Sequence, residues 1–316
     1  MIELKQICKR FGQRWAVEDL SLQVPKGEIY GLLGHNGAGK STAIGMMLGQ
    51  VWPTDGEVRV CGFDVVTDRQ RALQKVGAIF ETPVFYDYLS GWRNLEIFTH
   101  YTAPTSKQRL QEVVEWVGLT GREQSKVKTY SHGMRARLAL AQALLPRPDL
   151  LILDEPGDGL DPEGIHEMRE TILRLRREMG LTILLSSHLL SEVEQLCTRI
   201  AVMNQGRKVF EGTLASIQSS KQWVRLSVND FPAAVTRLRA ENLITDSRGG
   251  QLIALAANSK IEQVARCLVK NEIAIYEISL QVQDLESFYL SLMHPDALHG
   301  QSAQAPEADA LVNLKS

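Results

Sequence analysis

The feature that most constrains this chain is a glycine-rich run that directly follows the short apolar segment 29–33. Its members are Gly34, His35, Asn36, Gly37, Ala38, Gly39, Lys40, Ser41 and Thr42. Their spacing matches G-x-x-x-x-G-K-S/T, the pattern of a phosphate-binding loop between a β-strand and an α-helix. Glycines let successive backbone N–H groups point inward, and the N-terminus of the next helix, expected over 41–48, adds partial positive charge. The run therefore predicts a nucleotide-phosphate site rather than an ordinary strand-to-helix turn.

Two side chains of this loop have predicted tasks of their own. Lys40 would reach the β- and γ-phosphates of a nucleoside triphosphate, and the Ser41 hydroxyl would hold Mg²⁺. The loop by itself indicates nucleotide binding and does not say what the nucleotide is used for. Later motifs have to decide that.

The composition limits the classes of protein to which the chain can belong. It has 316 residues, of which 44% are hydrophobic and 23% charged, with a formal net charge of −2. These values suit a globular α/β core with room for a second, smaller domain. The near-neutral charge gives no electrostatic signature of nucleic-acid binding, so we expect no nucleic-acid partner. Four scattered cysteines, without metal-ligand spacing, are expected to be small buried residues of a reducing compartment.

Neither a membrane-spanning segment nor a secretory signal is expected. No apolar run approaches the roughly 18 residues that a spanning helix needs, and the N-terminal residues do not have the form of a signal peptide. If the protein works at a membrane, another polypeptide has to supply the membrane part.

Strand and helix patterns alternate through the first two thirds of the chain. Short apolar strands are expected at 2–6, 18–24, 27–33, 57–61, 76–80, 150–153 and 181–185. Apolar residues recur at helical spacing through 91–145, where Thr120 and Glu123 have the spacing of a helix capping box. A charged helix is expected at 164–178. This alternation predicts an α/β fold with a parallel core.

The amino-acid composition changes near 212–221, and we place a linker over 216–222. Beyond it, a small α+β domain is expected over 223–293. Its strands are expected at 223–228, 252–256 and 273–279, and its helices at 233–240, 261–270 and 285–292. Residues 294–316 have no periodicity and are expected to form a disordered tail, in which His294 and His299 are solvated rather than metal ligands.

Two apolar strands deliver polar side chains to the same edge of the predicted sheet. Asp154 and Glu155 follow the strand at 150–153, and His188 follows the strand at 181–185. The carboxyl ends of parallel strands are where α/β sheets present functional groups. Asp154 suits the Mg²⁺ shell, Glu155 suits a general base for an attacking water, and His188 suits contact with a γ-phosphate. Two acids that cap a strand, or a structural histidine, are the alternatives.

A second anion site is expected where Ser131 precedes a helix. Ser131 would be the N-cap, and the exposed N–H groups of His132 and Gly133 would face an anion. Because the chain already has a phosphate loop, this site suggests a phosphate presented by another subunit. An ordinary helix cap is the alternative.

These motifs carry a family resemblance over about residues 1–215. In order and spacing the chain resembles an ATP-binding cassette (ABC) transporter ATPase subunit, with a signature segment at 131–134 and Gly-Leu-Asp-Pro at 159–162. The segments 77–83 and 89–95 resemble the branch of the family that includes bacitracin-type antibiotic exporters. The segment 285–289 is similar to a sequence found near the C-terminus of such exporters. The resemblance implies a P-loop NTPase cassette with a mixed sheet core and a helical subdomain inserted over about 91–145.

The resemblance also implies an activity and partners. It implies hydrolysis of ATP to ADP and phosphate with Mg²⁺, coupled to transport. It implies a second copy of the chain or a homologous ATPase subunit, and a multispanning membrane permease that holds both at the cytoplasmic face of the inner membrane.

In such a pair, two subunits would lie head to tail around two ATP molecules. Ser131 and Gly133 of one subunit would close on the γ-phosphate held by the other's Lys40. Asp161 would lie at the seam between the subunits. Phe11 would stack on the adenine base of ATP, and Val17 would lie beside it. The alternative for Phe11 is a position in the hydrophobic core.

Three departures from the family pattern stand out. Tyr130, His132 and Met134 replace three of the five usual signature residues, so a side chain stands where glycine is usual. Glu81 stands where the family has a glutamine that senses Mg²⁺ and contacts the membrane partner, and we count it among the metal ligands. Phe11 replaces the commoner tyrosine.

Two other classes of function are weighed against a transporter subunit. A soluble ABC ATPase of translation or DNA repair would bring a second cassette, a zinc module, coiled coils or basic surfaces, and the sequence has none of these patterns. The presence of Glu155 and His188 argues against a regulatory nucleotide-binding module without turnover. His132, which departs from the usual signature, leaves that module as an alternative.

Overall fold

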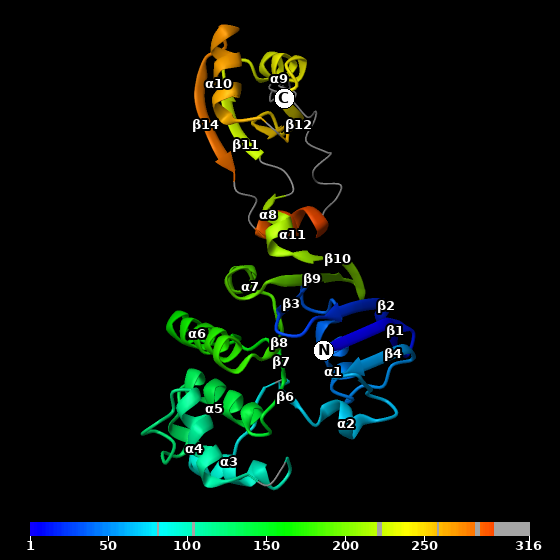
Figure 1. Ribbon diagram of the computed structural model, residues 1–316, viewed down its shortest axis with the longest axis vertical. Helices are drawn as coiled ribbons and strands as arrows, with labels where there is room; N and C mark the ends of the chain where they lie inside the picture. Colours follow the sequence, from blue (N-terminus) through cyan, green and yellow to red (C-terminus); the bar gives the residue numbers. More distant parts are fainter. Residues whose placement is uncertain (81, 103–104, 220–222, 258, 282–284, 294–316) are drawn as a thin grey trace, which may run out of the picture. The chain divides into compact units, whose positions relative to one another are not determined.

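The computed structural model describes residues 1–80, 82–102, 105–219, 223–257, 259–281 and 285–293 (Figure 1). The chain divides into two compact units, Met1–Ser216 and Ile217–Ser316. The predicted tail 294–316 lies outside the described residues, and so do residues 220–222 of the predicted linker. The described part of that linker belongs to a short helix, α8 (Leu214–Ser219), whose Ile217 is buried.

The first unit alternates strands and helices along the chain. Its elements are β1 (Ile2–Phe11), β2 (Arg14–Val24), β3 (Ile29–Leu33), α1 (Lys40–Met47), β4 (Asp55–Val60), β5 (Phe63–Asp64), α2 (Arg69–Leu73), β6 (Val76–Ile79), α3 (Gly91–Thr99), α4 (Lys107–Trp116), the 3-10 helix η1 (Val127–Thr129), α5 (His132–Leu144), β7 (Leu150–Asp154), α6 (Pro162–Met179), β8 (Thr182–Ser187), α7 (Leu190–Leu196), β9 (Arg199–Asn204) and β10 (Arg207–Thr213).

A six-stranded sheet with the order β10-β9-β3-β8-β7-β6 forms the centre of this unit. The strands from β9 to β6 run parallel, and β10 is antiparallel to β9. Every residue of β3, β7 and β8 is buried, as expected for parallel strands covered on both faces. A second, antiparallel sheet has the order β2-β1-β4-β5. The predicted mixed core is confirmed.

Helix α1 packs between these two sheets. Its Ile44 and Met47 share one buried apolar cluster with Val58 of the antiparallel sheet and with Leu32 and Ile152 of the central sheet. Burial of these side chains is the main favourable term that holds the layers together. The same packing fixes the first turn of α1, where the glycine-rich loop ends.

Helices α3, α4 and α5 each begin at a serine N-cap. Ser90, Ser106 and Ser131 accept hydrogen bonds from backbone N–H groups of the first helical turn, which satisfies donors that have no partner within the helix. The predicted capping box at 120–123 is wrong. That segment forms turns, because Gly121 has a φ of 81° and so breaks helical geometry.

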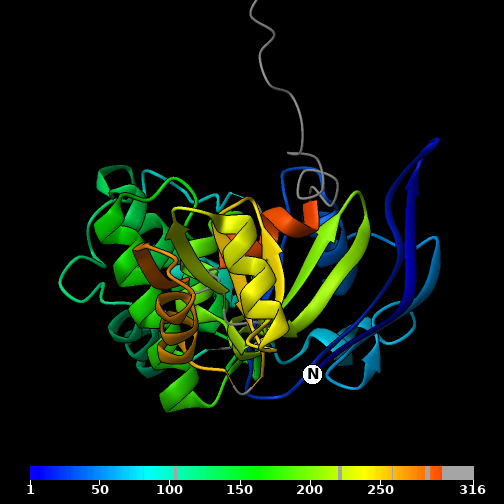
Figure 2. The same ribbon diagram turned by 90° about the horizontal axis from the view of Figure 1, so that it is seen from above.

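The second unit contains a four-stranded antiparallel sheet with the order β12-β13-β11-β14. Its elements after α8 are β11 (Trp223–Val228), α9 (Phe231–Ala240), β12 (Ile244–Arg248), β13 (Leu252–Leu255), α10 (Ile261–Lys270), β14 (Ile275–Gln281) and α11 (Leu285–Met293). Helices α9 and α10, drawn in Figures 1 and 2, share a buried apolar cluster with the sheet. Together β11 to β14 form the split β-α-β arrangement.

A chain that ends near Gln222 should fold and bind Mg-ATP. The apolar cluster of the second unit contains no residue of the first, so removing it should leave the first core intact. Circular dichroism melting and calorimetric titration with Mg-ATP measure both properties. Aggregation of the shortened chain, or loss of binding, would make the second unit integral to the first.

Two further features bear on the sequence expectations. In the described part of the chain, no helix is both long and apolar enough to cross a membrane. Cys197 and Cys267 are buried, as expected, whereas Cys8 and Cys61 are half-buried. All four thiols are free.

Candidate functional site

The glycine-rich loop joins β3 to α1 at the carboxyl edge of the central sheet. Gly37 and Gly39 have φ angles of 83° and 103°, which L-residues with side chains rarely adopt. At Gly39 a Cβ would also lie 2.4 Å from the Ala16 carbonyl oxygen. This position therefore needs glycine for both conformation and space.

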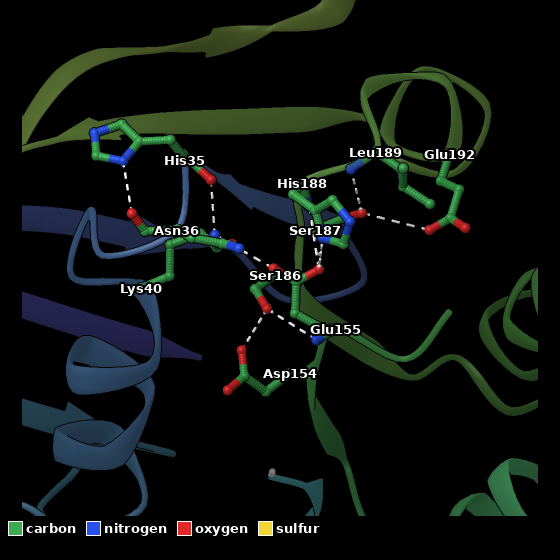
Figure 3. Close-up of polar contacts among 11 residues, drawn as sticks. His35, Asn36, Lys40, Asp154, Glu155, Ser186, Ser187, His188, Leu189 and Glu192 are labelled. Carbon is green, nitrogen blue, oxygen red and sulfur yellow. Dashed lines mark hydrogen bonds and ion pairs between the residues drawn. The ribbon is translucent and has the colours of Figure 1, made fainter. Parts of the chain in front are cut away.

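Lys40 is held inside this loop. Its side chain is 6% exposed, and its Nζ donates a 2.7 Å hydrogen bond to the Gly34 carbonyl. The same Nζ lies 3.3 Å from Glu155 Oε1 (Figure 3). A buried ammonium needs such partners, and phosphate oxygens could take the place of the carboxylate.

Glu155 lies between Lys40 and His188. Its Oε2 is 2.6 Å from His188 Nδ1 and also accepts the His188 backbone N–H at 3.2 Å. The Glu155 backbone has a φ of 48°, a conformation rare for a residue with a side chain. Its N–H donates to Ser186 Oγ at 2.9 Å. The carboxylate is thus held between an ammonium and an imidazole, where it could orient and deprotonate a water.

Asp154 is 8% exposed and accepts a 2.5 Å hydrogen bond from Ser186 Oγ. The described residues include no group of three or more His, Cys, Asp and Glu able to hold a metal ion. Asp154 and Ser41 nevertheless fit Mg²⁺ by donor type, since this ion takes one or two protein oxygens and completes its shell with water and substrate phosphates.

A cavity of about 630 Å³ opens over these groups. Its lining residues are Phe11, Arg14, Ala16, Asn36, Gly37, Ala38, Gly39, Lys40, Ser41, Thr42, Glu155, Asp158 and His188. Phe11 is 54% exposed, and Lys9 Nζ lies over its ring, 5.0 Å from the centroid, so a flat base could stack on the face that Lys9 does not cover. Arg14 and Asp158 were not predicted. Each lies three positions after a predicted site residue, and this proximity could have indicated them. Neither belongs to a motif with a recognised spacing.

Several predicted residues lie outside this cavity. Val17 is fully buried in the core, because alternation along β2 turns it inward. Ala16 lines the cavity in its place. His35 does not line the cavity; its ring lies between Asn36 and Asn204, with Nδ1 2.8 Å from the Asn36 carbonyl oxygen and Nε2 3.1 Å from Asn204 Oδ1. Gly34 contributes its carbonyl to Lys40.

The predicted second anion site is on a different part of the unit. Ser131 caps α5 by accepting the Met134 N–H at 3.2 Å, and Gly133 follows in the first turn. Asp161 caps α6 by accepting the Gly164 N–H at 2.9 Å. None of these three lines the cavity that Lys40 lines. Glu81 lies outside the described residues.

The unusual signature residue Tyr130 has a structural role. It is buried, its hydroxyl donates to the Arg122 carbonyl at 2.8 Å, and it packs against Gly91, where a Cβ would lie 2.4 Å from the hydroxyl oxygen. Burial raises the pKa of this hydroxyl. Tyr130 thus ties the start of α5 to the start of α3.

Comparison with known proteins decides the family. The sequence profile of the ABC transporter family matches residues 17–158. An uncharacterised ABC transporter ATP-binding protein, YhcH of Bacillus subtilis (strain 168), is 40% identical over 300 residues, covering 92% of this chain and 95% of its own. The chain belongs to the ABC transporter ATP-binding proteins. The predicted resemblance is confirmed.

Two further matches agree. The bacitracin transport ATP-binding protein BcrA of Enterococcus faecalis is 37% identical and covers 93% of this chain and 96% of its own. A solved ATP-binding subunit of an ABC transporter superposes with a TM-score of 0.62 at 29% identity, over 70% of this chain and 92% of the other. This ABC ATP-binding protein therefore has the P-loop NTPase fold, binds nucleotide and belongs to a family of ATPases.

Proposed function

We propose that this ABC ATP-binding protein hydrolyses ATP to drive a membrane exporter. The observation that carries the chemistry is the contact chain from Lys40 through Glu155 to His188, at 3.3 Å and 2.6 Å, on the floor of one cavity. These side chains come from three separate segments, and their convergence at the sheet edge is typical of a catalytic site.

In this proposal each group has one task. Glu155 takes a proton from the attacking water, and His188 fixes the carboxylate by its hydrogen bond to Oε2. Lys40 exchanges Glu155 for β- and γ-phosphate oxygens when ATP binds. Ser41 and Asp154 would hold Mg²⁺, which when bound neutralises phosphate charge. Phe11 stacks on adenine.

We propose further that two chains, or this chain and a homologue, pair head to tail. Ser131, the N-cap of α5, is exposed, Gly133 in its first turn is half-buried, and neither lines the cavity of its own chain. A helix N-terminus attracts phosphate, and a γ-phosphate bound to Lys40 of the partner would meet it. Asp161 would then lie at the seam. Glu81, by its position in the family pattern, is proposed as a contact to Mg²⁺.

The proposed membrane partner is a multispanning permease, and the proposed site of action is the cytoplasmic face of the membrane. The support is the match to a bacitracin transport protein over 93% of this chain, which extends through the second unit. The test is expression of the chain alone and together with each candidate multispanning membrane protein encoded near its gene. We expect the chain to sediment with membranes only in the second case. A chain found in the supernatant in both cases contradicts the proposed partner.

A further inference from the structure

A buried acid that the proposed mechanism does not use lies directly behind the site. Glu192 is in the first turn of α7, five positions after the end of β8, the strand that leads to His188, and it is 7% exposed. Figure 3 shows its carboxyl beside Ser187, on the side away from Lys40. Glutamates are rarely buried to this extent unless their carboxyl groups have a partner.

The carboxyl of Glu192 contacts both segments that carry the proposed catalytic groups. Its Oε2 accepts a hydrogen bond from Ser187 Oγ at 3.4 Å, and Ser187 Oγ accepts the Leu189 N–H at 3.0 Å. On the other side, a Cβ on Gly157 would lie 2.6 Å from Oε1. Gly157 is in the turn that follows Glu155. The Asp158 N–H closes this turn by donating to the Glu155 carbonyl at 3.0 Å.

The electrostatic surroundings favour an uncharged carboxyl. Burial is the largest effect and raises the pKa of Glu192; the Ser187 hydrogen bond and the charge of His188 lower it by smaller amounts, the charge of Glu155 raises it by less again, and Arg169 lowers it least. Oε1 is buried and has no hydrogen-bond partner in the described residues. In the carboxylate form, Oε1 would carry negative charge without a hydrogen-bond partner. In the protonated form, the oxygen without a partner is neutral, which costs less free energy.

We propose that Glu192 is a positioning residue for hydrolysis. Its carboxyl fits between Gly157 and Ser187 and so sets the distance between the turn that carries Glu155 and the turn that carries His188. This inference rests on the proposed role of those two residues. It adds that the Glu155–His188 contact is held from behind, by a group that never touches ATP.

The test compares three variants in steady-state ATP hydrolysis. Glu192→Ala empties the space and should lower kcat about 10- to 100-fold, since a shift near 1 Å can cost that much, while KM stays within about twofold. Glu192→Gln keeps the shape without a charge and should retain kcat within about twofold. Glu194→Ala, on the same helix and only half-buried, is the matched control and should behave as wild type.

Gly157→Ala gives an independent approach from the opposite side. Its added Cβ would displace the Glu192 carboxyl, so kcat should fall and KM should not. The double variant with Glu192→Ala should lose less kcat than the product of the two single losses, because both substitutions disrupt the same contact between Gly157 and the Glu192 carboxyl. If Glu192→Ala does not fold, this variant and Glu192→Gln decide the matter.

The pH profile separates positioning from a general loss of stability. Wild type should lose kcat, relative to Glu192→Gln, as the pH rises through the raised pKa of Glu192, because only the glutamate can ionise. The folded state also binds that proton more tightly than the unfolded state, so the wild-type free energy of unfolding should fall over the same rise.

Three results would overturn the proposal. Wild-type kcat in Glu192→Ala or in Gly157→Ala would show that nothing is positioned there. Equal losses in the glutamine and alanine variants would show that the charge, not the shape, is needed. A wild-type protein that binds ATP without hydrolysing it would instead overturn the proposed function, so the two failures are distinguishable.

Discussion

Glu155→Gln should lower the rate of ATP hydrolysis about 10²- to 10⁴-fold, the usual worth of a positioned general base, while ATP still binds. Glutamine cannot accept the proton of the attacking water, although it fills the same space between Lys40 and His188. Removing the Glu155 charge also frees Lys40 from its 3.3 Å ion pair, so binding should not weaken. Phosphate release and calorimetric titration with Mg-ATP measure the two effects separately.

The matched control is Glu163→Gln, which removes one negative charge at an exposed position in the first turn of α6. It should leave turnover and binding unchanged. Lost affinity with unchanged residual turnover in Glu155→Gln would contradict the role of general base. Unchanged turnover would show that Glu155 is not the general base, whereas a wild-type protein without turnover would favour the regulatory module.

Lys40→Ala should weaken ATP binding at least about tenfold, or abolish it. Lys40 is the buried cation of the loop, and charge-assisted hydrogen bonds contribute about 1.5–3 kcal/mol each. The substitution also removes the cation paired with Glu155 and leaves His188 as its partner, so the carboxylate would repel the incoming phosphates more strongly. Calorimetry with Mg-ATP measures the loss.

Lys75→Ala removes the same side chain at an exposed position before β6 and should bind ATP as wild type does. A Lys40→Ala protein that is folded and binds ATP with unchanged affinity would contradict the assignment of the phosphate loop, and with it the proposed Lys40 contact to phosphate.

The parts of the site that are local in sequence could be predicted. The glycine-rich loop has its conformation encoded by spacing, and strands such as β7 and β8 are continuous apolar runs whose ends reveal which polar residues reach the edge of the sheet. The N-cap at Ser131 is likewise a local signal, and the structure confirms it.

The shared sheet edge of Glu155 and His188 was predicted, but the particular contacts between side chains of distant segments could not be. Nothing near Lys40 indicates that Glu155, 115 positions later, lies 3.3 Å away, and nothing near Glu192 indicates Gly157. Strand β12 (Ile244–Arg248) was missed because it is an edge strand with a mostly polar sequence, so alternation is weak. The capping-box pattern at 120–123 failed because Gly121 favours a turn there.

The central claim is that hydrolysis needs a dimer in which Ser131 of one chain faces the phosphate bound by the other. Sedimentation velocity of Glu155→Gln with saturating Mg-ATP tests it most directly, because slow turnover should trap the dimer. A second protein adds Ser131→Asp, which preserves the N-cap but places a negative charge against the γ-phosphate. A third adds Ser106→Asp, the same change at the exposed N-cap of α4.

The account predicts a dimer for Glu155→Gln and for its Ser106→Asp derivative, and an ATP-bound monomer for its Ser131→Asp derivative. A monomer in all three proteins at saturating Mg-ATP, or a dimer that survives Ser131→Asp, would contradict it.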